Sequence, residues 1–237
     1  MSPRAAIRAV LSAALLLTAS CGGGAQKPPR ATLGAPTSGG AAESDIRFED
    51  LPVTRLDRAR VPTPNAANPS QGATNAQVVV QLWSDFECPF CADVHPALTE
   101  MLRVYAGKVQ LVWHDYPLPF HAHARLAANA GREAYAQGGS AAFWKFHDAI
   151  YTTSSPKLDT EGLVGFALKA GLDPTRFRDA LTTQRHDAEI KRDLDVGNVL
   201  GVEGTPAFLV NDYFFVGAVP FEILRVVVDR ALSDAGA

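Results

Sequence analysis

Two cysteines separated by two residues, Cys88 and Cys91, are the residues of this 237-residue chain whose spacing points most directly to chemistry. They lie in the segment "SDFECPFC", residues 84–91. Two thiols this close can form a structural disulfide, ligate a metal ion, or alternate between dithiol and disulfide by exchange with other proteins. Exchange needs one thiol that ionises readily and a second thiol within reach of it. The elements that position the pair therefore decide between these uses.

A buried strand followed by a helix is predicted around the pair. The Val-rich run "VVVQLW", residues 78–83, is typical of a buried strand. From Pro89 the apolar residues recur at helical spacing as far as a stop at Gly107, and Pro96 is expected to kink this helix. Cys88 therefore falls where the strand ends and the helix begins.

This position would activate Cys88. The free N–H groups and the positive dipole end of a helix N-terminus favour a thiolate, so we expect Cys88 to have a lowered pKa and to act as the nucleophile. Pro89 costs no hydrogen bond in the first turn. Cys91 follows about one turn later, so it is expected to reach Cys88 as the more buried, resolving thiol.

A metal site and a structural disulfide are weaker alternatives. The residues Cys88, Cys91 and His95 form a C-x2-C-x3-H pattern, but a structural zinc needs a fourth ligand. His121 and His123 are two apart and would diverge on a helix. A disulfide across two residues closes a very small loop and removes little chain entropy. We therefore predict no metal and no cofactor.

The rest of the chain predicts an α/β sheet with a helical insertion. Within the insertion, helices are expected to end at Gly138 and Gly171, and one to begin at Pro174 with Asp173 as its N-cap. In order, the expected elements are strand 78–83, helix 89–107, strand 108–118, the helical block of about 120–200, a hairpin over 206–217 and a closing helix from about Pro220.

A second motif, Thr205–Pro206, stands at the start of the first hairpin strand in "GVEGTPAFLVN". Proline there removes a donor from the sheet, and an X–Pro bond is the common home of a cis peptide. A cis bond would leave the Thr205 backbone free to pair with an extended peptide. Taken by itself, the motif leaves cis and trans equally open.

The first 45 residues predict export and tethering. Arg4 and Arg8 precede a short apolar run, so residues 1–20 are expected to be a signal peptide. Cys21 follows small residues, as in the lipobox of bacterial lipoproteins, and is the expected lipidation site; an ordinary cleaved signal is the alternative. The Gly-, Pro- and Ala-rich residues 21–45 are a predicted flexible linker, and residues 46–237 the folded domain.

The composition of the chain limits the classes of partner that can be expected. The net charge is −3, and the chain has neither a basic block nor aromatic residues interleaved with basic ones, so no nucleic-acid partner is expected. A chain with three cysteines in an oxidising compartment would not keep an idle thiol pair. The expected location is the bacterial periplasm or cell envelope.

Taken together, the chain resembles the DsbA-like thiol–disulfide oxidoreductases, which have a thioredoxin-like fold with an inserted helical domain. The resemblance implies Cys88 as nucleophile, Cys91 as resolving cysteine, and Pro206 as a cis-proline facing them with Thr205 before it. It covers about residues 60–235 in order. The matching segments are "SDFECPFC", "YPLPFHAHARLAANAGREAYAQG", "FWKFHDAIY", "LGVEGTPAFLVND" and "GAVPFEIL".

Several residues near the cysteine pair differ from those of DsbA proper. Together with Pro89, they are expected to modulate the site. Phe90 stands where DsbA has a histidine that can donate to the thiolate. Gln81 stands near the position of a buried acid of DsbA, so proton handling should differ. Asp85 and Glu87 should raise the pKa of Cys88, unless solvent screens them. We therefore expect an oxidant milder than DsbA.

Other side chains were assigned by the same reasoning. Phe86 and Phe90 are expected to form an apolar lip for unfolded client chains, whereas Trp83 is better suited to the core. His121 is a candidate for the groove beside the site. The remaining histidines, His95, His114 and His147, are expected at the surface or in helix packing.

The expected activity is that of a protein thiol–disulfide oxidoreductase acting as an oxidase. Its expected partners are exported proteins with free or mispaired cysteines, a redox partner protein in the membrane, and a lipid anchor through Cys21. A reductase or isomerase, and a chaperone-like peptide-binding module, are the alternatives. Replacing Cys88 separates an enzyme from a peptide-binding module, because only the enzyme depends on its thiol.

Overall fold

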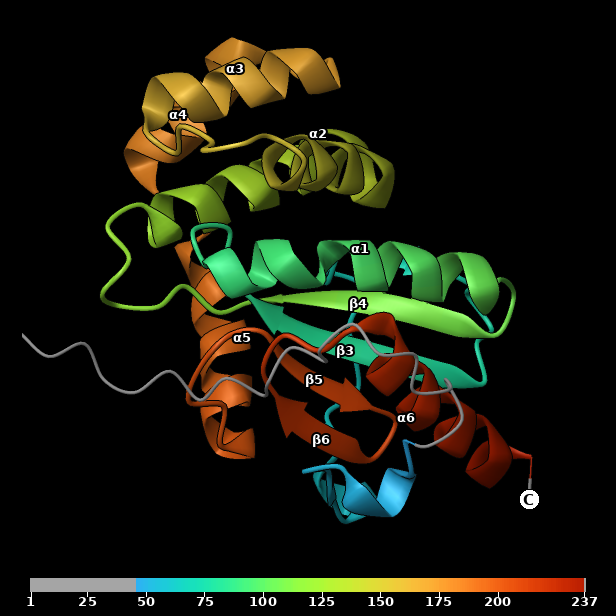
Figure 1. The fold of residues 1–237 in the computed structure, drawn as a ribbon. Helices are drawn as coiled ribbons and strands as arrows, with labels where there is room; N and C mark the ends of the chain where they lie inside the picture. Colours follow the sequence, from blue (N-terminus) through green and yellow to red (C-terminus); the bar gives the residue numbers. More distant parts are fainter. Residues whose placement is uncertain (1–45, 237) are drawn as a thin grey trace, which may run out of the picture. The chain divides into compact units, whose positions relative to one another are not determined.

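A mixed six-stranded sheet in the order β1-β6-β5-β3-β4-β2 forms the centre of the computed structural model, which describes residues 46–236 (Figure 1). The signal peptide, the lipidated Cys21 and the linker predicted for residues 1–45 lie outside the described residues. β3 is parallel to β4, and the other pairs are antiparallel. The strands are β1 (Thr54–Arg55), β2 (Ser70–Gly72), β3 (Val78–Ser84), β4 (Val109–Asp115), β5 (Ala207–Val210) and β6 (Tyr213–Val216).

Helices cover both faces of this sheet (Figure 1). Residues alternate between the faces along a strand. On β3, Val80 and Leu82 pack with α1 and α6, whereas Trp83 packs with α5 on the opposite face. The helices are α1 (Pro89–Val104), α2 (Ala124–Tyr151), α3 (Thr160–Ala170), α4 (Pro174–Thr183), α5 (Asp187–Leu200) and α6 (Phe221–Ala235), with short 3₁₀ turns at Phe48–Asp50 and Arg58–Arg60.

The predicted helical insertion is confirmed as α2 to α5. α2 is interrupted where a stop was predicted: Gly138 and Gly139 have non-helical backbone angles, and the φ of Gly139 is 65°, in the left-handed region that favours glycine. Gly171 ends α3 with a φ of 83°. Asp173 caps α4 by accepting hydrogen bonds from two backbone N–H groups. The fold is therefore thioredoxin-like with an inserted helical domain.

An arm of residues 46–76 was not predicted to carry sheet structure, yet it supplies both edge strands. β1 pairs with β6, and β2 pairs with β4. Runs of two and three residues are too short for an alternating pattern to be visible in the sequence. Among the described residues, no helix is both long and apolar enough to cross a membrane.

Candidate active site

Cys88 is the N-cap residue of α1, as the strand–helix junction predicted. Its backbone N–H donates to the carbonyl of Asp85 at 3.0 Å. Its own carbonyl accepts from the N–H groups of Cys91 and Ala92 at 3.1 and 3.3 Å. Pro89 is the first residue of the helix, where its missing N–H leaves no bond unmade. The thiol therefore stands over the first turn of a sixteen-residue helix.

The pKa of the Cys88 thiol is lowered to about 6. The largest cause is a hydrogen bond from the thiol of Cys91, and the side chain of Thr205 and the backbone at the start of α1 add to it. These favourable bonds outweigh the burial of Cys88, which acts in the opposite direction. At neutral pH Cys88 is thus mostly a thiolate, the form that attacks disulfides.

Cys91 has the opposite character. Its side chain is buried, with 2% of the residue exposed. Burial, and then the negative charge that Cys88 takes on, raise the pKa of Cys91 well above its usual range, while a hydrogen bond with the hydroxyl of Ser84 lowers it in part. Two neighbouring thiols with divergent pKa values make one nucleophile and one protonated partner.

A pair of hydroxyl groups beside Cys91 was not predicted from the sequence. The hydroxyls of Ser84, at the end of β3, and Tyr151, at the end of α2, lie 3.3 Å apart. The Tyr151 hydroxyl also donates to the carbonyl of Asp85 at 3.0 Å. Burial and the nearby cysteines raise the pKa of Tyr151 well above its usual range, so it stays protonated. Cys91 thus has a hydrogen bond with the Ser84 hydroxyl, and Tyr151 holds that hydroxyl from the other side.

The Thr205–Pro206 peptide bond is cis. The thiol of Cys88 donates to the carbonyl of Thr205 at 3.4 Å across 117 positions of sequence. The carbonyl of Pro206 accepts from the N–H of Gly217 at 2.8 Å, which holds the loop on β6. The hydroxyl of Thr205 is buried and has no hydrogen-bond partner in the dithiol form of the described site. It is therefore available to a thiolate at Cys88.

The two acidic neighbours of the site are held in hydrogen bonds. The carboxylate of Asp85 is fully buried and accepts from the N–H groups of Glu87 and Leu118 at 2.8 and 2.9 Å, with His121 Nδ1 at 2.7 Å. Glu87 is paired with His123. The pKa of Cys88 is lowered despite these two neighbouring acids, contrary to one expectation. His121 lies beside the site, as expected.

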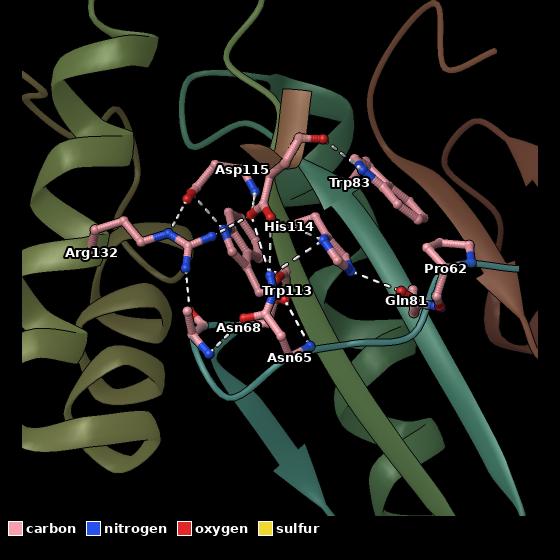
Figure 2. Close-up of polar contacts among 11 residues, drawn as sticks. Pro62, Asn65, Asn68, Gln81, Trp83, Trp113, His114, Asp115 and Arg132 are labelled. Atoms are coloured by element: carbon pink, nitrogen blue, oxygen red, sulfur yellow. Dashed lines mark hydrogen bonds and ion pairs between the residues drawn. The ribbon is translucent and has the colours of Figure 1, made fainter. Parts of the chain in front are cut away.

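Gln81 is not brought to the cysteines, which corrects its expected role. It follows Val80 and precedes Leu82 on β3, so its side chain points to the face opposite α1. There its amide donates to the carbonyl of Pro62 at 2.8 Å, and its oxygen lies 3.0 Å from His114 Nε2 (Figure 2). His114 was expected at the surface or in helix packing, but it is buried on β4 within the same set of polar contacts.

Beneath the site, this set of contacts centres on the buried guanidinium of Arg132, and we call it the Arg132 cluster (Figure 2). Arg132 on α2 pairs with Asp115 at the end of β4 and with Asp193 on α5, and donates to the carbonyl of Ala67 in the arm. Asp193 also accepts from the backbone N–H of Asp115 at 2.8 Å. One cation thus fastens the insertion and the arm to the end of β4.

Two surface hollows lie at the first turns of α1. One, of about 570 Å³, is lined by Cys88 itself, by Pro89, and by residues of the α2–α3 loop such as Pro156 and Lys157. The other, of about 540 Å³, is mostly apolar and lies between the exposed ring of Phe90 and the segment 218–222 before and at the start of α6. The expected apolar lip is therefore only partly present, because Phe90 is 52% exposed but Phe86 is buried under the site.

Alkylation of the reduced chain is expected to follow a pH profile with a midpoint near 6 at Cys88. Replacing Thr205 with valine should raise this midpoint by about 0.5–1 unit, because the thiolate loses one hydrogen-bond donor. The rate of iodoacetamide labelling against pH, resolved by peptide mapping, measures both midpoints. Thr153→Val is the matched control, since Thr153 lines the same hollow as Cys88 but its hydroxyl donates to the Ala149 carbonyl. A wild-type midpoint above 8 would contradict the proposed activation.

The chain matches one family model and is similar to known disulfide-exchange proteins. A family model described as thioredoxin matches residues 65–230. The chain is 30% identical over 176 residues to a probable disulfide bond formation protein D of Bacillus anthracis, covering 69% of this chain and 78% of that protein. It is similar to the crystal structure of a thioredoxin-like oxidoreductase from Silicibacter pomeroyi, with a TM-score of 0.64 and 27% identity, covering 71% and 94% of the two chains.

A second kind of relative is a membrane transporter. The chain is 36% identical over 166 residues to the Na(+)/H(+) antiporter NhaA 3 of Salinispora tropica, covering 70% of this chain. The match includes 25% of that protein, so the chain spans about a quarter of the antiporter's length. The similarity therefore concerns one segment of the antiporter.

Proposed function

The chain belongs to the thioredoxin family, among the DsbA-like thiol–disulfide oxidoreductases, and on that premise we propose that it oxidises thiols of exported proteins outside the cytoplasm. A substrate thiolate would attack the sulfur of Cys88 in the Cys88–Cys91 disulfide, and Cys91 would leave and take up a proton. A second substrate thiolate would then attack the substrate sulfur of the mixed disulfide, releasing an oxidised substrate and the Cys88 thiolate. The two electrons remain in the dithiol until a redox partner removes them.

The observation that supports exchange in the oxidising direction is the lowered pKa of Cys88. A thiol pKa of about 6, against 9.0 for an unperturbed thiol, stabilises the reduced form at pH 7 by about 1.4 kcal/mol, or about 30 mV in a two-electron couple. A more stable dithiol makes the disulfide a stronger oxidant. The raised pKa of Cys91 does not change the stability of the reduced form at pH 7, because that thiol is already protonated.

The same pKa supports an oxidant milder than DsbA. Thioredoxin combines a cysteine pKa of about 7 with a potential of about −270 mV, and DsbA combines about 3.5 with about −120 mV. Linear interpolation between these two pairs of cysteine pKa and reduction potential gives roughly −230 mV for a pKa of about 6. Phe90 fits this value, because its ring offers the thiolate no hydrogen-bond donor.

Equilibration with glutathione tests the proposal. We expect a potential of roughly −250 to −180 mV, together with oxidation of a dithiol peptide by the oxidised chain. A potential as oxidising as that of DsbA would refute the milder oxidant. A value at or below that of thioredoxin, with Cys88 and Cys91 found mostly as dithiol by thiol trapping in cells, would refute the oxidase and favour a reductase or isomerase.

We propose that the chain is exported by a signal peptide over residues 1–20 and anchored by lipid at Cys21, with residues 21–45 as a tether. The basic and apolar start of the sequence, and the small residues before Cys21, support this location. The similarity to a segment of an antiporter is consistent with work beside a membrane. Separating membrane from soluble fractions in the thiol-trapping experiment tests it, and a wholly soluble chain would contradict the anchor.

A further inference from the structure

Two histidines and an aspartate converge on one point outside the cysteine pair. His95 comes from α1, and His147 and Asp148 come from α2. Asp148 Oδ1 lies 2.8 Å from His147 Nδ1 and 3.1 Å from His95 Nε2. The three potential ligand atoms all lie within 4.8 Å of one another. One carboxylate oxygen thus stands between two imidazole nitrogens.

These separations are close to those of a metal site. Ligands bonded at about 2.0–2.1 Å to a tetrahedral ion stand roughly 3.3–3.5 Å apart. Small rotations of the partly exposed His95 and Asp148 side chains would therefore allow an ion to replace the hydrogen bonds that now join the three residues. Two imidazoles and a carboxylate form a donor set that suits zinc and the neighbouring divalent transition metals.

The cluster also has an open side. A cavity of about 100 Å³ is lined by all three residues, together with Thr99 and Trp144. Since a water molecule occupies roughly 30 Å³, the cavity has room for water as a fourth ligand. Three protein ligands and one open position are typical of zinc sites that are not purely structural.

The protonation states favour ligation. Burial lowers the pKa of His147 to about 4, although its bond to Asp148 opposes the shift, so its imidazole is neutral at physiological pH. Burial opposes ionisation of Asp148, but hydrogen bonds from His147 and His95 outweigh it and hold its pKa below the usual range. Asp148 is thus held as a carboxylate, the form that ligates a metal.

The surroundings of His147 fix its ring. Trp113, Trp144 and Tyr151 stand with their ring centroids 5.2, 4.7 and 4.6 Å from it. Its Nε2 is buried and has no hydrogen-bond partner in the described part of the chain. If Nδ1 ligates a metal, the proton moves to Nε2, where aromatic rings can accept a weak N–H···π interaction.

We propose that His95, His147 and Asp148 bind a divalent transition-metal ion such as Zn²⁺. His95 lies one helical turn beyond Cys91, at i+4, so the site is adjacent to the cysteine pair but shares no ligand with it. The ion binds to the oxidised chain, in which neither sulfur of the pair is a thiolate. Metal binding is thus separable from disulfide exchange.

Zn²⁺ titration of the tag-free, fully oxidised chain against a chromogenic chelator tests the site. We expect one equivalent to bind, and His95→Gln and Asp148→Asn each to weaken binding at least tenfold. His95 and Asp148 are partly exposed, so these variants should fold, which circular dichroism checks. His123→Gln is the matched control, because His123 is a partly exposed histidine paired with Glu87 and lies outside the cluster.

Co²⁺ provides a second readout. The oxidised chain should give a Co²⁺ spectrum without the near-ultraviolet charge-transfer band of a thiolate ligand, and His95→Gln should lose the spectrum. The proposal is overturned if the oxidised wild-type chain takes up no Zn²⁺, or if the His95 and Asp148 variants bind as tightly as the His123 control. Neither result would bear on disulfide exchange, which is measured without added metal.

Discussion

A chain with Cys91 replaced by serine is expected to accumulate mixed disulfides at Cys88, whereas one with Cys88 replaced by serine should form none at Cys91. The side chain of Thr205 and the backbone at the start of α1 still stabilise a thiolate at Cys88 when the Cys91 thiol is gone, and a serine hydroxyl at position 91 can also donate to it, so Cys88 still attacks a disulfide. The resulting Cys88–substrate disulfide persists, because no second thiol attacks it. Apart from Cys21, the remaining cysteine of the Cys88→Ser variant is Cys91, whose thiol is buried. Mass spectrometry after incubation of the reduced variants with oxidised glutathione measures the adducts.

Turnover of a dithiol peptide should fall by about a thousandfold or more in both variants, since the two thiols act as one unit. Equal adduct formation by both variants would contradict the assignment of Cys88 as nucleophile. Binding of an unfolded client peptide is the control measurement. If wild type and Cys88→Ser bind the peptide equally while the wild type shows no exchange, the chaperone-like alternative is favoured.

Replacing Arg132 with methionine is expected to lower the free energy of unfolding by about 3–5 kcal/mol. The substitution leaves the carboxylates of Asp115 and Asp193 buried without their cation, and their side chains are 0% and 6% exposed. Urea unfolding of the oxidised chain measures the loss. The loss should be largest at neutral pH and shrink as the pH falls. Burial already raises the pKa of Asp115 in the presence of Arg132, and protonation of the buried carboxyls relieves the loss of the cation.

Arg125→Met is the matched control for this experiment. Arg125 lies on the same helix and pairs with Asp187, but both side chains are well exposed. Its loss should change stability by less than about 1 kcal/mol. A second variant that also changes Asp115 and Asp193 to asparagine should recover part of the stability lost with Arg132. Equal effects of Arg132→Met and Arg125→Met would contradict the role given to the Arg132 cluster.

Local patterns in the sequence were sufficient for the elements that hold the cysteines. The Val-rich run predicted β3 to within one residue, and Pro89 marked the start of α1. The glycines at 138 and 171 predicted a break and a helix end, and left-handed backbone angles are found at Gly139 and Gly171. These features depend on residues close together in the chain, which is why they could be read without the structure.

Contacts between distant segments could not be predicted in this way. Gln81 was expected near the position of a buried acid of DsbA, where it would affect proton handling at the cysteines. One residue along a strand reverses the face, however, and the side chain of Gln81 lies on the opposite side of the sheet. Tyr151 reaches Ser84 across 67 positions, and nothing in the helix around it marks that contact. Arg132 reads as an ordinary helix residue until β4 and α5 bring Asp115 and Asp193 to it.

The two edge strands that the arm supplies affect how an unfolded chain can bind to the sheet. An open sheet edge offers unpaired N–H and C=O groups on which an extended polypeptide can grow as an extra strand, a route to aggregation. Here both edges end in strands of only two and three residues, donated by residues 54–55 and 70–72. A client docking at Cys88 therefore finds little backbone to join, and we expect it to leave once its sulfurs have been exchanged.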